Sequence, residues 1–343
     1  MEKAKRQSNF ELLRIFAMLL IVLFHIQSHA ARKQLMGGYG YFDKPIYYLR
    51  LLIIYFGAAF GSIGNNLFIM ISGYFMNAND HIDAGKTAKK LLSQLGFAVV
   101  LLVIVNSLWL TFFRTEILSV IGMESISGFN SGWWFLGYYF FIILLAKLFL
   151  NRFTAKLTES QFKSLLLTLL ALCQFTWTAT LLEGLASGLN TAVTGIFFFL
   201  MGGYIARFNP FKKFKAFTFS LGIAAAYAVW FLSQYNRVSQ KIDEYIKSGN
   251  TYFVRTVEET AVYSIFVVII VICLFELFRR INILYNAAVN FVGKSTLMIY
   301  FVHESGFFKM FYYDEPWMDT LTTNVPQYCL MWLKWGAISF ELT

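Results

Sequence analysis

Apolar runs alternate with short basic segments along almost the whole chain. Eight runs stand out: Phe16–Ile26, Leu51–Ile63, Phe97–Val105, Trp133–Leu150, Leu165–Leu172, Ile196–Ile205, Phe217–Leu232 and Ala261–Phe278. Several approach the roughly 20 residues that an α-helix needs to cross a hydrocarbon core about 30 Å thick. The pattern therefore predicts an all-α protein, a polytopic bundle of transmembrane helices.

We expect about ten such helices, at about residues 9–30, 48–76, 88–112, 132–151, 164–183, 189–206, 215–234, 257–278, 286–307 and 325–343. The last segment carries Lys334 and stops at Thr343, so it is either a short helix or an incomplete one. With only four prolines, the helices should be mostly unbroken. We expect loops at 31–47 and 235–256. No internal repeat or linker divides the chain, so residues 1–343 form a single predicted transmembrane domain.

The composition excludes a soluble protein. Hydrophobic residues make up 58% of the chain and charged residues 14%, whereas a soluble domain carries about 25% charged residues. The net charge of +10 gathers between the apolar runs, in the clusters Lys3/Lys5/Arg6, Lys86/Lys89/Lys90, Arg152/Lys156/Lys163, Arg207/Lys212/Lys213/Lys215 and Arg279/Arg280. This placement follows the positive-inside rule. It predicts a multi-pass protein of the cell membrane with a cytoplasmic N-terminus, and argues against a nucleic-acid partner.

Two cationic or titratable residues lie inside the first predicted helix. Arg14 and His25 are eleven residues apart, which is three helical turns, so both lie on one face, about 16 Å apart along the axis. A charged residue within a span should face the bundle interior or a wet cavity. Histidine can act as a general base or acyl carrier near neutral pH, and arginine suits phosphate or carboxylate. The alternative is that Arg14 reaches the interface and His25 is a buried, hydrogen-bonded histidine.

Two further histidines raise other possibilities. His29 follows His25 with a spacing that allows a metal site, but the sequence offers no third ligand nearby, so we expect no metal. His303 precedes Glu304 in the ninth helix. A histidine beside a carboxylate is unusual within a membrane, although a helix end at the outer interface would also explain this pair.

Small and aromatic residues mark two other candidate positions. The second helix has glycines and small polar residues around Ser72, which permit close helix packing and also leave room for a ligand against the backbone. Trp134 opens the fourth helix, where tryptophans usually serve as interfacial anchors.

Together, five motifs in order resemble acyltransferase family 3, the membrane-bound O-acyltransferases of surface polysaccharides. They are Arg14, Ala17 and His25; Phe68 with Ser72-Gly73-Tyr74; Trp134-Phe135-Leu136; Phe199, Gly202 and Tyr204; and Ser295, Tyr300 and His303. The resemblance runs from about residue 8 to residue 304. Where the family has an arginine-rich segment, this chain has Lys86, Lys89 and Lys90, and the proline that commonly closes the fourth helix is missing.

The resemblance implies transfer of an acyl group, usually acetyl, from cytoplasmic acyl-CoA to a hydroxyl of a surface or exported polysaccharide. Acetyl-CoA is then the expected donor, and a glycan the acceptor. The resemblance gives His25 the role of base or transient acyl carrier, and Arg14 that of orienting the donor. The lysines at 86, 89 and 90 would attract the CoA phosphates. The expected substrate-binding residues are Ser72, Trp134, Tyr300 and His303.

Two rival interpretations remain open. A transporter or flippase for a polysaccharide precursor would also need transmembrane spans, aromatic residues and intramembrane charge. Against it, the sequence has no two-fold repeat and no paired broken helices. The chain could also be an inactive, truncated acyltransferase.

Overall fold

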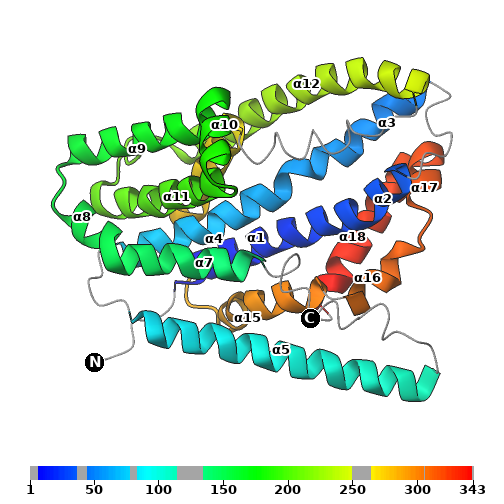
Figure 1. Ribbon diagram of the computed structural model, residues 1–343, viewed down its shortest axis with the longest axis horizontal. Helices are drawn as coiled ribbons and strands as arrows, with labels where there is room; N and C mark the ends of the chain where they lie inside the picture. The colour runs from blue at the N-terminus through cyan, green and yellow to red at the C-terminus, as the bar shows by residue number, and fades with distance from the viewer. Residues whose placement is uncertain are drawn as a thin grey trace.

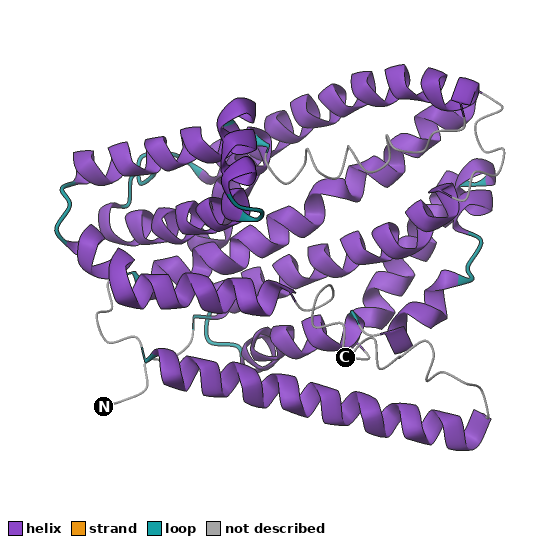
Figure 2. Ribbon diagram, in the orientation of Figure 1, coloured by secondary structure: helices purple, strands orange, loops and turns teal. Residues whose placement is uncertain are grey.

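The computed structural model describes residues 7–36, 45–77, 83–113, 134–248, 264–304 and 306–341, which form helices and no strands (Figures 1 and 2). The helices are α1 (Ser8–Ile26), α2 (Arg32–Met36), α3 (Pro45–Phe56), α4 (Phe60–Met76), α5 (Ala84–Phe113), α7 (Trp134–Leu145), α8 (Asn151–Ala155), α9 (Glu159–Gln174), α10 (Thr176–Leu185), α11 (Leu189–Phe208), α12 (Ala216–Ser248), α14 (Ile265–Arg280), α15 (Ala287–His303), α16 (Gly306–Tyr313), α17 (Trp317–Thr323) and α18 (Val325–Glu341). The predicted all-α architecture is confirmed.

Six of these helical stretches are long and apolar enough to cross a membrane: Ser8–Leu35, Leu52–Met76, Ala84–Trp109, Trp134–Ala155, Leu189–Phe208 and Ala216–Asn236. A bent pair, α9 with α10, makes a seventh if it counts as one span. Three of the spans contain a π- or 3₁₀-helical segment, so α1 continues into α2, α3 into α4, and α7 into α8. These helices are consistent with a multi-pass membrane protein.

The helix predicted at 164–183 is not continuous. Its two parts, α9 and α10, meet at an angle of 81°, and Phe175 between them has an extended backbone. The hydroxyl of Thr178 lies 3.1 Å from the carbonyl oxygen of Ala171 and 3.2 Å from that of Leu172, both near the end of α9. The side chain of Thr178 thus stabilises a bend at a position where the sequence has no proline.

The polar loop predicted at 235–256 is helical in its first part. α12 continues without a break to Ser248, because its polar end includes good helix formers such as Lys241 and Glu244. In the loop predicted at 31–47, α2 extends the first helix to Met36 and α3 begins at Pro45. Residues 37–44 and 249–263 lie outside the described part of the chain.

α1 lies at the centre of the bundle, between α4, α15, α14 and α18 (Figure 1). α4 also packs along α11, and at two points the backbones touch. Gly73 lies against the carbonyl of Phe199, and Gly202 against the carbonyl of Met70. A side chain at either glycine would force the helices apart, so this contact fixes α4 against its neighbours.

α5 lies along one side of the bundle, where it packs on α15 and α7 (Figure 1). Its outer surface exposes large apolar side chains, among them Leu92, Phe97 and Phe112. Such a surface suits contact with lipid. The inner surface of α5 closes one wall of the cavity described next.

Candidate active site

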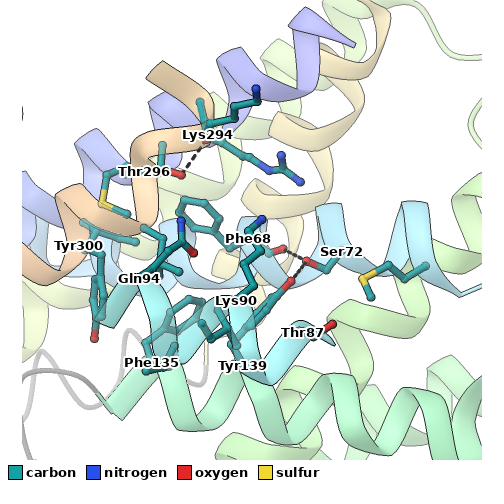
Figure 3. A pocket seen from close by; sticks show the side chains of 18 of the residues that line it. Phe68, Ser72, Thr87, Lys90, Gln94, Phe135, Tyr139, Lys294, Thr296 and Tyr300 are labelled. Atoms are coloured by element: carbon teal, nitrogen blue, oxygen red, sulfur yellow. Dashed lines mark hydrogen bonds between the residues drawn. The ribbon is translucent and has the colours of Figure 1, made fainter. Parts of the chain in front are cut away.

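A cavity of about 560 Å³ opens between α1, α4, α5, α7 and α15 (Figure 3). Residues predicted from the sequence to form the site gather on its wall: Arg14, Ser72, Lys86, Lys90 and Tyr300. They come from four different helices. We call this space the basic cavity, after the cations at its mouth.

The mouth of the basic cavity carries Arg14, Lys86, Lys90 and Lys294, and among the described residues of its wall Asp83 is the one acidic residue. Asp83 stands just before α5 and accepts a hydrogen bond from the backbone N–H of Lys86 at 2.9 Å, which fixes the start of that helix. Even with Asp83 on the wall and Glu11 paired to Arg14, cations outnumber carboxylates at the described mouth, and this positive potential attracts anionic ligands.

Arg14 is held in place by an ion pair within α1. Its Nη1 donates a hydrogen bond of 2.8 Å to Oε1 of Glu11, whose side chain is only 4% exposed. Gly293 of α15 packs against Glu11, so the pair lies at the α1–α15 contact. The guanidinium group is therefore oriented at the cavity wall, where it can meet a phosphate or carboxylate.

Deeper in the basic cavity the wall becomes aromatic (Figure 3). The ring of Phe135 lies 6.3 Å from that of Phe68 and 5.8 Å from that of Tyr300. Beside Phe68 the wall is polar, because the hydroxyl of Ser72 donates to the carbonyl of Phe68 and lies 3.1 Å from the hydroxyl of Tyr139. A slender, mostly apolar group with one polar atom would fit this part of the cavity.

Next to this deep end lies a group of polar side chains that we call the histidine cluster: the buried His303 and Glu304 and the partly buried His25 and His29. Nδ1 of His25 lies 2.5 Å from Oε1 of Glu304 and 2.9 Å from Nε2 of His303. Nε2 of His29 lies 3.4 Å from the same carboxylate oxygen. Lys309 of α16 binds the other oxygen at 3.1 Å.

The basic cavity and the histidine cluster adjoin each other. Ile21 lines the cavity, and His25 follows it by one turn of α1, about 6 Å along the axis. Tyr300 lines the cavity too, and its ring centre lies 5.8 Å from that of His303. The histidine cluster therefore lies next to the cavity wall at Ile21 and Tyr300, although His25 itself does not line the cavity.

Other predicted residues lie outside the cavity wall. His303 is 3% exposed and packs behind His25, so it supports that side chain. Trp134 is 44% exposed and packs on Tyr138 at 5.6 Å between ring centres. Lys89 is exposed on α5, away from the wall that Lys86 and Lys90 form.

Sequence reasoning missed Tyr139, Lys294 and Lys309, and gave Glu304 no role. Tyr139 lies within an aromatic run of α7, where nothing distinguishes it from lipid-facing neighbours. Lys294 interrupts an apolar helix, which was the available signal for a residue that faces a cavity.

The histidine cluster also contains a third potential metal ligand, which is distant from His25 and His29 in the sequence. Ligand atoms of His25, His303 and Glu304 all lie within 4.8 Å of one another. The separation of 2.5 Å between His25 and Glu304 nevertheless suits a hydrogen bond, since two ligands of one tetrahedral zinc ion lie about 3.3 Å apart at normal bond lengths. Lys309 also places a positive charge on the same carboxylate. We therefore assign the contacts to hydrogen bonds.

Comparison with known proteins identifies the family. The family model Acyl_transf_3, described as an acyltransferase domain, matches residues 7–333. A search of curated proteins and a search of solved structures each gave no match. The matched region runs from the start of α1 into α18 and includes the basic cavity and the histidine cluster. The chain belongs to acyltransferase family 3 and is a membrane acyltransferase.

Proposed function

We propose that the protein transfers an acyl group, in the first place acetyl, from acyl-CoA on the cytoplasmic side to a hydroxyl of a surface or exported polysaccharide. The observation that supports the proposal is a basic cavity whose wall residues Ile21 and Tyr300 lie next to the histidine cluster. The cavity volume of about 560 Å³ lies within the range of small-molecule sites, about 300–1,000 Å³.

The basic cavity matches the chemistry of acetyl-CoA. The phosphates of CoA would meet Arg14, Lys86, Lys90 and Lys294 at the mouth, because clustered cations raise the local concentration of an anionic ligand. The thin pantetheine arm would pass between the aromatic rings. Its amides could use the hydroxyl groups of Ser72 and Tyr139. The thioester would then lie at the deep end, near His25.

His25 would carry the reaction as general base or as transient acyl carrier. As a base, it takes the proton of the acceptor hydroxyl while the oxygen attacks the thioester carbonyl. The new C–O bond forms, the C–S bond breaks, and the proton passes from His25 to the departing thiolate. As a carrier, the imidazole nitrogen attacks the thioester carbonyl, and the N–C bond forms as the C–S bond breaks and CoA leaves as the thiolate. The acceptor hydroxyl then attacks this acyl group, the N–C bond breaks, and the hydroxyl proton neutralises the thiolate. In both cases the closed bundle excludes water that would hydrolyse the donor.

The basic clusters support a cytoplasmic N-terminus in the cell membrane. Asn9, at the start of α1, donates to the carbonyls of Phe278 and Arg279. Arg279 in turn donates to the side chain of Asn209, which follows α11. These contacts bring the basic segments around Arg207 and Arg279 to the end of the bundle that holds the N-terminal part of α1. By the positive-inside rule this end faces the cytoplasm.

The test is the acetyl content of surface polysaccharide in cells that express the wild type, His25→Ala or an empty vector, at equal membrane levels. We expect acetylation with the wild type, and none above the vector with His25→Ala. Lys89→Ala is the matched control for handling and expression, since that side chain lies off the cavity wall, and it should behave as the wild type. Equal acetylation in all strains would contradict the proposal. In that case export of a polysaccharide precursor is the next activity to measure.

A further inference from the structure

The carboxylate of Glu304 lies in a position that is unfavourable for protein stability. It is 8% exposed and stands at the C-terminal cap of α15. The partial negative charge of a helix C-terminus disfavours an anion there, and burial adds a desolvation cost. Its partners are nevertheless arranged around it: His25 and His29 on one oxygen, Lys309 on the other.

The hydrogen bonds of the cluster settle where the proton of His25 lies. Nδ1 of His303 is 2.8 Å from the carbonyl oxygen of Ile299, which can only accept, so this nitrogen carries a hydrogen. Nε2 of neutral His303 is then an acceptor. Nδ1 of His25 faces this nitrogen at 2.9 Å and the carboxylate of Glu304 at 2.5 Å. Because both neighbours are acceptors, Nδ1 of His25 must be the donor.

We propose that Glu304 is the positioning residue for His25: it holds the proton on Nδ1 of His25 and so leaves Nε2 as the reactive nitrogen. His303 supports this arrangement from behind through its own bond to the backbone. The inference rests on the proposed function, and it specifies which atom of His25 receives the hydroxyl proton or the acyl group.

The same contact stabilises the reaction's charged state. When Nε2 takes the proton of the hydroxyl, the ring becomes an imidazolium ion, and the carboxylate of Glu304 at 2.5 Å balances its charge. This is the relation of base and orienting carboxylate in hydrolase triads, where the carboxylate keeps its own charge throughout. Here the two partners come from α1 and from the end of α15, so the packing of these helices sets the geometry.

The kinetic test compares Glu304→Gln and Glu304→Asp with the wild type in lipid nanodiscs, with acetyl-CoA as donor. We expect Glu304→Gln to lower kcat about 10²- to 10⁴-fold, while the KM for acetyl-CoA stays within about twofold, because the cations at the mouth are unchanged. Glu304→Asp keeps the charge and should recover at least about tenfold over Gln. Glu183→Gln is the matched control, since that carboxylate caps the start of α11 away from the site.

A second readout does not depend on turnover. The chain has four histidines, so ¹⁵N-histidine labelling of the wild type in bilayers, with His25→Gln for assignment, reports the proton position on His25. We expect hydrogen on Nδ1 in the wild type and a shift toward Nε2 in Glu304→Gln.

A wild-type His25 with hydrogen on Nε2, or a folded Glu304→Gln within about threefold of wild-type kcat, would overturn the inference. If Glu304→Gln fails to fold, Glu304→Asp and the wild-type spectrum decide. A wild type without any turnover contradicts the proposed function instead, and the proton position on His25 then tests the geometry alone.

Discussion

The mouth of the basic cavity and the histidine cluster are both polar regions in an apolar bundle, but they are built differently. Lys86 and Lys90 reach the cavity from exposed positions on long side chains. His25 and Glu304 are short side chains, partly buried and buried respectively, and a hydrogen bond joins them across two helices. A long exposed cation attracts its ligand from many positions, whereas the cluster works in one geometry only. Substitutions at the mouth should therefore have weak effects, mainly on donor binding. Substitutions in the histidine cluster should have strong effects, mainly on the chemical step.

The largest effect is expected for His25→Ala. Loss of a general base or acyl carrier should lower kcat by about 10²–10⁴-fold or more. Binding of acetyl-CoA, measured by calorimetry on the purified protein, should stay within about threefold, because the cations at the mouth remain. If His25→Ala lost donor binding to the same degree as turnover, the proposed division between mouth and cluster would be wrong.

Arg14→Gln should give an intermediate effect. A hydrogen bond to a charged group contributes about 1.5–3 kcal/mol, which corresponds to about 10- to 150-fold in kcat/KM. The substitution also removes the partner of Glu11, so the double variant Glu11→Gln/Arg14→Gln is the control that restores charge balance. The double variant should be as stable as the wild type in a thermal unfolding assay, yet as impaired as the single one. Recovery of activity in the double variant would limit Arg14 to a structural role.

Smaller effects are expected at the lysines of the mouth. Lys86→Ala and Lys90→Ala should each raise the KM for acetyl-CoA about two- to fivefold with kcat unchanged, as for exposed charge pairs of up to about 1 kcal/mol. The effect should shrink as salt is raised from about 0.01 to 0.15 M, where screening shortens the reach of exposed charges. Lys89→Ala, on the same helix, should leave KM unchanged. Equal effects at all three lysines would point to a general surface charge instead of a site.

The smallest effect concerns the hydroxyl of Tyr139, which lies 3.1 Å from that of Ser72 in the aromatic part of the cavity. Tyr139→Phe removes one neutral hydrogen bond, about 1 kcal/mol, so kcat/KM should fall about fivefold. Tyr138→Phe is the matched control, because its hydroxyl donates to the carbonyl of Thr191 on α11. A larger loss for Tyr138→Phe than for Tyr139→Phe would place the acyl donor elsewhere.

The sequence predicted the parts of this site that lie within one helix. Arg14 and His25 share a face of α1 because of their spacing, and apolar length alone indicated most of the spans. The contact between His25 and His303 could not be predicted in this way, since it joins residues 278 positions apart. Only the packing of α15 against α1 brings Glu304 to Nδ1 of His25.

The bend between α9 and α10 was hidden for a different reason. The sequence there has no proline, and the side chain of Thr178 stabilises the break through contacts that form only once the helix has bent. The prediction for the polar half of α12 was wrong in the opposite direction. Its polarity indicated a loop, but residues with high helix propensity continue the helix to Ser248.

The proposed function requires the donor to enter at the mouth of the basic cavity from the cytoplasm and to react at His25. Sealed membrane vesicles that carry the surface polysaccharide test it directly, with acetyl-labelled acetyl-CoA supplied to one face at a time. We predict that label reaches the polysaccharide only from the cytoplasmic face, and that His25→Ala abolishes it while Lys89→Ala does not. Transfer from either face alike, or transfer that survives His25→Ala, would contradict the proposed function.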